Sequence, residues 1–228
     1  MKYLFILLSL FTVTGAVAQN EEALLQKVRT KLEKVTDYVA EGSMKLDVSF
    51  IKAPPSNVTV YYKKPDKFRV KKEDGISILP KGGVSVNVAS LLASKGYQTI
   101  PGGASVVDGV PVKIVKLIPT DDASDVVLSV LHIDEKTSVI RKAVVTTRQT
   151  GTYEVQLSYG AYTAWGLPDK VVFLFNTSDY KLPKGVTFEY EKGGEKKAAD
   201  KPKSNKGKVE ITYARYRINK GVDEKEFQ

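Results

Sequence analysis

Few side chains in this 228-residue sequence could perform covalent or metal chemistry. The chain contains no cysteine and a single histidine, His132. Cysteine nucleophiles, iron–sulfur clusters and cysteine-based zinc sites are therefore excluded, and a lone histidine argues against a multi-histidine metal site or a histidine-dependent triad. His132 lies in the apolar run VLHID, so we expect it to be a packed or surface residue of a strand.

The acidic residues and glycine pairs do not suggest a catalytic or nucleotide site either. The residues concerned are Asp121, Asp122, Asp125, Asp134 and Glu135, and the glycine pairs Gly82-Gly83 and Gly102-Gly103. Carboxylates in turns usually cap backbone N–H groups, and neither glycine pair has the strand, helix and Lys-Ser/Thr context of a phosphate-binding loop. We therefore expect a binding protein that is not an enzyme and needs no cofactor or metal, with a hydrolase using a serine or an aspartate as an alternative.

The composition is that of a folded, basic domain. Apolar residues make up 42% of the chain and charged residues 27%, which is typical of one domain or at most two. The 35 Lys and Arg exceed the 26 Asp and Glu and give a net charge of +9, which attracts anions such as phosphate, lipid headgroups or acidic proteins. The aromatic residues are not consistently flanked by Lys or Arg, so we expect no nucleic-acid partner.

The first 18 residues have the pattern of an export signal. Lys2 gives a basic start, residues 3–13 form an apolar run, and Ala16-Val17-Ala18 fits the preference of signal peptidase. The run is shorter than the roughly 20 residues that span a bilayer. We predict a signal peptide over residues 1–18 with cleavage near Ala18, and a soluble exported protein; an uncleaved membrane anchor is the alternative.

An amphipathic helix is predicted over residues 21–36. Its apolar positions recur at helical spacing: Leu24, Leu25, Val28, Leu32 and Val35. Asn20 could cap the helix, and Glu21 and Glu22 would suit the positive end of its dipole. We expect this helix to pack on a sheet, and a membrane-binding helix is the alternative.

Beyond Glu41 the apolar period changes from 3.6 to 2, which predicts strands. In the first three strands the apolar set that shares one face is Met44, Leu46, Val48, Phe50, Val58, Val60, Tyr62, Phe68 and Val70. We expect these nine residues on the concave face, with Lys45 and Asp47 on the other. Further strands are predicted over residues 112–118, 126–133, 139–148, 152–163, 170–176, 186–191 and 209–218. About ten strands imply a large antiparallel sheet that must curl, close or be covered on one face.

Two segments interrupt the strand pattern. Residues 76–110 are rich in Gly and Pro and include one short helix-like piece, which predicts a lid or insert. Residues 191–207 contain six lysines and no large apolar side chain, which predicts a flexible basic loop. This loop is either a solvated hairpin tip or a contact for an anionic lipid or an acidic partner. We treat residues 19–228 as a single domain that contains both segments.

The run from Val60 to Val70, VYYKKPDKFRV, resembles the signature of LolA-type outer-membrane lipoprotein-sorting proteins. In that family a strand leads into Lys-Arg-Pro, then x-x-Phe, then another strand. Weaker similarity lies in the preceding helix with Leu32 and Val35, in the strands around residues 133–151, and in the closing segment 209–223 with Phe227.

The resemblance implies a strongly curved antiparallel half-barrel with an apolar concave face and helices that close over it as a lid. Members bind acyl chains and carry lipoproteins through the periplasm to the outer membrane, so the ligands would be lipoprotein acyl chains or other lipids. The protein partners would be an inner-membrane release complex and an outer-membrane acceptor. Relatives of this fold sense lipids or misfolded envelope proteins, so a periplasmic sensor or interaction module with a regulatory partner is the alternative.

The resemblance also assigns roles to residues. The nine apolar residues of the first three strands would line the ligand cavity, and Lys64 would latch either segment 76–110 or the N-terminal helix in the closed state. The usual family residue at the latch is Arg, which offers a planar fork of donors where Lys offers a point charge. The alternative is that Lys63 and Lys64 are solvated turn charges.

Overall fold

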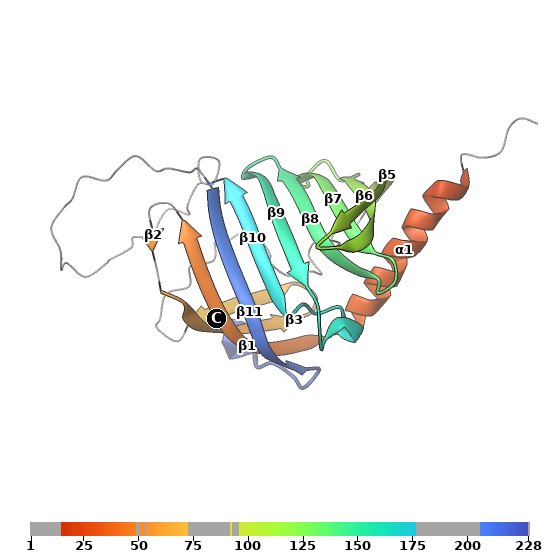
Figure 1. Ribbon diagram of the computed structural model, residues 1–228. Helices are drawn as coiled ribbons and strands as arrows, with labels where there is room; N and C mark the ends of the chain where they lie inside the picture. Colours follow the sequence, from red (N-terminus) through yellow and green to blue (C-terminus); the bar gives the residue numbers. More distant parts are fainter. Residues whose placement is uncertain are drawn as a thin grey trace, which may run out of the picture.

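The computed structural model describes residues 15–48, 51–52, 54–72, 92, 96–176 and 206–227. In these residues one α-helix lies against one antiparallel sheet (Figure 1). The elements are α1 (Gly15–Glu33), β1 (Asp37–Val48), β2 (Ile51–Lys52), β3 (Ser56–Lys63), β4 (Lys67–Lys72), β5 (Tyr97–Val107), β6 (Val110–Pro119), β7 (Val126–Asp134), β8 (Val139–Thr147), β9 (Gly151–Ser158), η2 (Thr163–Trp165), β10 (Lys170–Asn176), β11 (Lys206–Ile218) and η3 (Glu224–Phe227). The prediction of a mainly β fold with an N-terminal helix is confirmed.

Ten strands form a continuous path in the order β4-β3-β1-β11-β10-β9-β8-β7-β6-β5, and β2 pairs with the end of β1. The predicted adjacency of the first three strands is confirmed. β1 and β11 are neighbours although they lie far apart in the sequence, with a register running from Tyr38 opposite Ile218 to Val48 opposite Gly207. This pairing joins the two halves of the meander.

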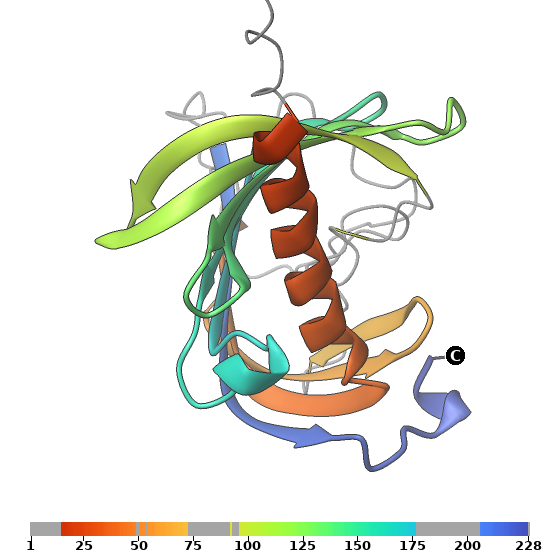
Figure 2. The same ribbon diagram turned by 90° about the vertical axis from the view of Figure 1, so that its right-hand side faces the viewer.

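The prediction of a strongly curved half-barrel is corrected by the structure. The two edge strands of the path, β4 and β5, do not pair with each other, and the sheet is neither strongly curled nor closed. A sheet of this size can curl, close or be covered on one face, and here a helix covers it. Helix α1 runs across one face, from β5 and β6 at its N-terminal part to β1 and β3 at its C-terminal end (Figure 2).

The helix lies earlier in the sequence than predicted. It begins at Gly15 and ends at Glu33, so Asn20 is not its N-cap and neither Glu21 nor Glu22 lies in its first turn. The predicted apolar stripe is nevertheless correct, because Leu24, Leu25 and Val28 are buried and Leu32 packs partly buried against the core. No helix among the described residues is long and apolar enough to cross a membrane.

Part of the predicted lid or insert is regular sheet. Residues 97–107 form the edge strand β5, which turns into β6 through Asp108 and Gly109, both at positive φ (49° and 76°). Asp-Gly is a favoured two-residue hairpin loop because it tolerates this conformation. The rest of the predicted lid, apart from Leu92 and Gly96, lies outside the described residues, as do predicted strand 186–191 and loop residues 191–205. The predicted signal peptide is described only for residues 15–18, which belong to α1.

Candidate functional site

The sheet face beneath α1 carries the apolar residues predicted for the site. Met44, Leu46, Val58, Val60, Tyr62 and Val70 are all buried, at 8% exposure or less, and Phe68 is partly buried against them. Lys45 and Asp47 are exposed, as the predicted register requires. The side chain of Val48 and all of Phe50 lie outside the described residues. The structure therefore gathers seven of the nine predicted residues in one core, and their role as ligand contacts stays a prediction.

The apolar face is larger than the predicted set. Strands β6 to β11 contribute further buried side chains to the same cluster: Val115, Leu117, Leu131, Ile133, Ile140, Ala143, Val145, Tyr153, Val155, Leu157, Val171, Phe173, Val209, Ile211 and Tyr213. Their signal was present in the sequence, because each of these strands also alternates with period two. The sequence argument gave these residues no role in the site, since it followed the short family signature in the first strands.

Helix α1 occupies this face in the structure. Leu24, Leu25 and Val28 are at most 4% exposed and belong to the same core as the sheet residues. A crevice of about 150 Å³, open to solvent, lies beside the helix between Lys31, Leu32 and strand β8 at Val139 and Ile140. That figure includes open solvent, and the crevice itself encloses no space for even a water molecule. With the helix in this position, the described residues leave no room in the crevice for a long acyl chain.

Polar contacts to β5 and β6 hold α1 at Glu21, Glu22 and Arg29. The Thr99 hydroxyl donates to a Glu22 carboxylate oxygen at 3.0 Å, and the Arg29 guanidinium lies 4.8 Å from the centroid of the Tyr97 ring. Glu21 is 2% exposed, 3.8 Å from the Lys113 ammonium, and its Oε2 has no hydrogen-bond partner. A buried carboxylate oxygen without a partner is costly, so this part of the helix is held less well than its apolar packing suggests.

The C-terminal end of α1 makes hydrogen bonds with three other parts of the chain. Lys64 Nζ donates to the Glu33 carbonyl at 2.7 Å, Asn219 Nδ2 donates to the Lys34 carbonyl at 2.8 Å, and Lys31 Nζ donates to the Thr137 carbonyl. Cationic donors suit this end because it is the negative pole of the helix. Lys64 therefore contacts the helix, which is one of the two partners expected for it; whether the contact acts as a latch stays a prediction.

The buried carboxylate of Asp134 fixes the turn whose Thr137 carbonyl accepts the hydrogen bond from Lys31. Asp134 accepts hydrogen bonds from the backbone of Lys136 (3.0 Å) and Thr137 (3.2 Å), from the Thr137 hydroxyl (2.7 Å) and from the Arg141 guanidinium (3.1 Å). Burial alone would raise the pKa of Asp134, but these hydrogen bonds outweigh it and lower the pKa below its ordinary value. Burial also lowers the pKa of Lys31, helped by the nearby charge of Lys34.

Tyrosines cluster where the helix ends. The ring of Tyr38 lies 5.2 Å from Tyr62 and 5.4 Å from Tyr216, which also contacts Tyr162 and Tyr213 at 4.8 and 5.1 Å between centroids. The Tyr216 hydroxyl donates to the Pro168 carbonyl at 2.7 Å, and burial raises the pKa of Tyr38, Tyr213 and Tyr216 well above the ordinary value. These neutral rings close one end of the apolar face.

Two of the acidic turn residues accept hydrogen bonds from the backbone. Asp121 accepts from the Ala123 backbone at 2.9 Å and Asp125 from that of Gln149 at 3.1 Å, as expected of turn caps. His132 is half-buried in β7, and burial, together with the charge of Lys142, lowers its pKa. Within the described residues no three His, Cys, Asp or Glu side chains lie close enough together to hold a metal ion.

Among solved structures, a LolA superfamily protein and two further domains share this fold at low sequence identity. A domain from Vibrio parahaemolyticus, provisionally described as that of an outer membrane lipoprotein-sorting protein, aligns with a TM-score of 0.58 at 13% identity, over 92% of this chain and 97% of that one. A LolA superfamily protein from Nitrosomonas europaea gives 0.53 at 9% identity, over 89% and 96%.

A DUF1329 family protein from Desulfovibrio piger gives a TM-score of 0.53 at 11% identity, over 92% of this chain and 97% of that one. No protein-family model matches the sequence, and no curated protein matches it. The three structural comparisons confirm, at the level of the fold, the resemblance that the sequence signature suggested.

Proposed function

We propose that this protein is a periplasmic carrier that holds acyl chains against the sheet face beneath α1. Its cargo would be lipoproteins on their way to the outer membrane. The observation that carries the proposal is a continuous apolar face covered by a single helix. The fold similarity to a lipoprotein-sorting domain supports it. In this proposal Met44, Leu46, Val48, Phe50, Val58, Val60, Tyr62, Phe68 and Val70 line part of the ligand site, and no residue acts as a catalyst.

Ligand binding requires α1 to leave the face, and the energies of the two states are comparable. Burying a Leu or Val side chain is worth roughly 1.5–3 kcal/mol, so exposing Leu24, Leu25 and Val28 costs on the order of 5–9 kcal/mol. An acyl chain with about 14 methylenes gains roughly 11 kcal/mol at about 0.8 kcal/mol for each one buried. The chain can therefore replace the helix, and the helix can in turn displace the chain when an acceptor is present.

A matched pair of substitutions tests this competition. Leu25 and Leu131 are both fully buried, one on the helix and the other on the sheet. Leu25→Ala weakens the cover without touching the sheet face, so it should tighten binding of 11-(dansylamino)undecanoic acid at least tenfold, as measured by fluorescence titration. Leu131→Ala removes a contact that helix and ligand share, so it should not tighten binding.

A second pair of substitutions removes fewer buried atoms and serves if the Leu→Ala variants do not fold. Val28→Ala on the helix and Val155→Ala on β9 change equally buried residues and should show the same contrast with smaller magnitude. If both helix variants weaken the probe's binding as much as the sheet variants do, the ligand does not compete with α1. If the wild-type protein binds no acyl probe, the carrier proposal is wrong.

The cargo and the compartment are tested separately. Protein purified from the periplasm should carry lipids or lipoproteins that native mass spectrometry detects, and its N-terminal sequence should begin at or near Gln19. In a transfer assay, a lipidated peptide bound to the carrier should move to acceptor membranes. A sequence that still begins at Met1 would contradict the cleaved signal.

A further inference from the structure

The hairpin of β3 and β4 carries a row of cations on the face opposite the core. Val60, Tyr62, Phe68 and Val70 point inward and are buried or half-buried. Because side chains alternate along a strand, the residues that alternate with these four point outward. These outward residues include the four cations Lys63, Lys67, Arg69 and Lys71, which we call the cation row.

Three cations elsewhere on the sheet pair with acids of a neighbouring strand. Lys142 pairs with Glu154, Lys170 with Glu210 and Arg215 with Glu41, at 2.9, 2.9 and 2.7 Å. Among the described residues, the cation row instead makes its ion pairs with Glu224 and Glu226 of η3. No acid within the described strands therefore pairs with the row, and an acidic segment supplies the charge.

Segment 223–227 lies along the row in an ordered way. Glu224 bridges Lys63 (2.7 Å) and Lys67, and Glu226 pairs with Lys71 at 2.5 Å. The Tyr61 hydroxyl hydrogen bonds with Glu226, Arg69 donates to the Glu226 carbonyl at 3.4 Å, and the Lys67 ammonium lies 6.0 Å from the Phe227 ring centroid. The row thus recognises two alternate carboxylates, a backbone carbonyl and an aromatic ring.

The attachment of this segment changes abruptly at Val222. Val222 is 6% exposed, and the residues before it are fixed by Asp37, which accepts from the backbone of Lys220 and Gly221 at 3.1 and 2.8 Å. None of the residues of η3 is buried, and Glu224 remains half exposed in its ion pairs. Exposed ion pairs are weak and are screened by salt. Residues 223–227 can therefore leave the row while Val222 stays in place.

We propose that the cation row is a docking site for an acidic segment of a partner protein, which the chain's own residues 223–227 occupy in its absence. The partner segment would carry two carboxylates at alternate positions followed by an aromatic residue. A peptide fits better than a membrane surface, because the contacts include a backbone carbonyl and an aromatic side chain as well as charges. This site lies on the opposite face from the proposed acyl site and does not depend on it.

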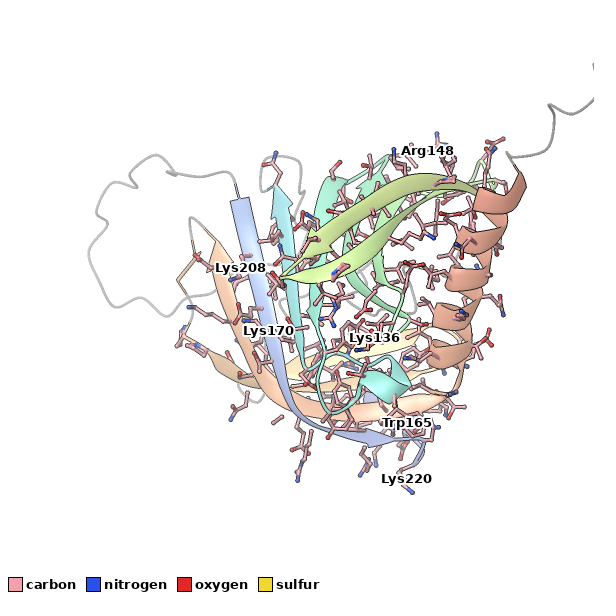
Figure 3. The ribbon with its side chains drawn as sticks, turned by 45° about the vertical axis from the view of Figure 1, so that its right-hand side comes forward. Lys136, Arg148, Trp165, Lys170, Lys208 and Lys220 are labelled. Carbon is pink, nitrogen blue, oxygen red and sulfur yellow. The ribbon has the colours of Figure 1, made fainter. Side chains whose placement is uncertain are left out.

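The test uses the full chain and a fluorescein-labelled peptide that carries residues 221–228. The variant Glu224→Gln/Glu226→Gln frees the row, so the labelled peptide should bind it about tenfold more tightly than it binds the wild type, by fluorescence anisotropy at low salt. Adding Lys67→Gln/Lys71→Gln should reverse this gain. The matched control Lys170→Gln/Lys208→Gln changes two lysines of β10 and β11 (Figure 3) and should leave peptide binding unchanged. Both lysines pair with Glu210, at 2.9 and 3.0 Å.

Three outcomes would overturn the proposal. The first is equal peptide binding by the wild type and the freed variant. The second is tighter peptide binding by the freed variant that persists when Lys67 and Lys71 are also replaced, or that is lost when Lys170 and Lys208 are replaced instead. The third is a freed variant that binds vesicles of phosphatidylglycerol, but not of phosphatidylcholine, and does not bind the peptide, which would make the row a membrane contact. Circular dichroism of each variant checks that the sheet is intact, and the single substitution Glu226→Gln, with a smaller expected gain, replaces the double one if it is not.

Discussion

At the residue scale, two adjacent lysines hold different parts of the molecule. Lys64 donates to the Glu33 carbonyl at the end of α1, whereas Lys63 contacts the Val222 carbonyl and Glu224 on the other side of the hairpin. A cation at a helix C-terminus is worth about 0.3–1 kcal/mol when exposed. Lys64→Ala should therefore speed hydrogen exchange at the amides of Lys34 and Val35, which close the last turn, about two- to fivefold.

Lys63→Ala is the control for that prediction. It removes a charge one position away and should leave those two amides unchanged in the same NMR exchange experiment. Equal acceleration by both variants would mean that general charge loss, and not the contact with Glu33, controls the end of the helix. No effect of either would mean that Lys64 is a solvated turn lysine.

A second prediction at this scale concerns the buried carboxylate of Asp134. Its folded pKa is lowered, so the ionised form stabilises the fold above the unfolded pKa of about 3.9, and this contribution is lost as the pH falls through the folded value. Asp134→Asn should lower the free energy of unfolding by about 1–3 kcal/mol at pH 7 and by less near pH 3, where the unfolded carboxyl is already mostly protonated. Urea titrations at both pH values measure this.

The matched variant is Asp122→Asn, because Asp122 is exposed in a loop. Its substitution should change the free energy of unfolding by less than about 0.5 kcal/mol at either pH. A loss in Asp134→Asn that is the same at pH 7 and near pH 3 would show that the charge contributes nothing and that the hydrogen bonds alone matter.

At the scale of elements, the pairing of β1 with β11 depends on a glycine. The register shifts between Glu41 and Gly42, and a Cβ at Gly42 would lie 2.1 Å from the Thr212 carbonyl oxygen. Since that obstacle is backbone in the middle of the sheet, Gly42→Ala should cost about 1–3 kcal/mol of stability in urea unfolding. At Gly96 the nearest atom is the movable Thr120 hydroxyl at 2.7 Å, so Gly96→Ala should cost less than about 1 kcal/mol; similar losses would refute the reasoning.

Period-two alternation predicted most strands because it is a local signal that burial on one face enforces. β5 was missed because Pro101, Gly102 and Gly103 interrupt its alternation at a bulge against β6, although the Asp108-Gly109 turn marks a hairpin. The helix start was placed too late because Asn20 was interpreted as the N-cap, with Glu21 at the positive end of the helix dipole. The burial of Glu21 depends on Lys113, a long-range contact that no local pattern contains.

For the candidate site too, the local patterns were predicted and the long-range contacts were not. The inward set of the first three strands followed from alternation, and Lys64 came from the resemblance to a short signature. The contacts of Lys31 with Thr137, of Glu22 with Thr99 and of Glu224 with Lys63 join residues at least 77 positions apart. Such pairs depend on how the sheet is ordered, and the sequence alone did not fix the β1–β11 pairing that brings them together.

At the scale of the whole molecule, the sheet and its cover are connected in different ways. The sheet is held by backbone pairing along all ten strands of its path, including β1 with β11. The helix is held by apolar packing and by side-chain contacts, and its N-terminal half contains the unpaired Glu21 oxygen. The part of α1 up to Val28 can therefore separate from the face while the sheet keeps its hydrogen bonds and the helix end keeps its contacts with Lys64 and Asn219.

This difference predicts where ligand binding changes protection from hydrogen exchange. If an acyl chain takes the place of α1, saturation with 11-(dansylamino)undecanoic acid should raise deuterium uptake in residues 20–28 at least tenfold in rate, because the helix loses its packing partner and short isolated helices are marginal in water. Uptake in β8 and β9 should stay the same or fall, since the ligand covers that face. Mass spectrometry of the exchanged peptides separates these regions. Unchanged uptake in residues 20–28 of a protein saturated with probe would place the ligand elsewhere, and increased uptake throughout the sheet would mean that the probe unfolds the protein instead of replacing its helix.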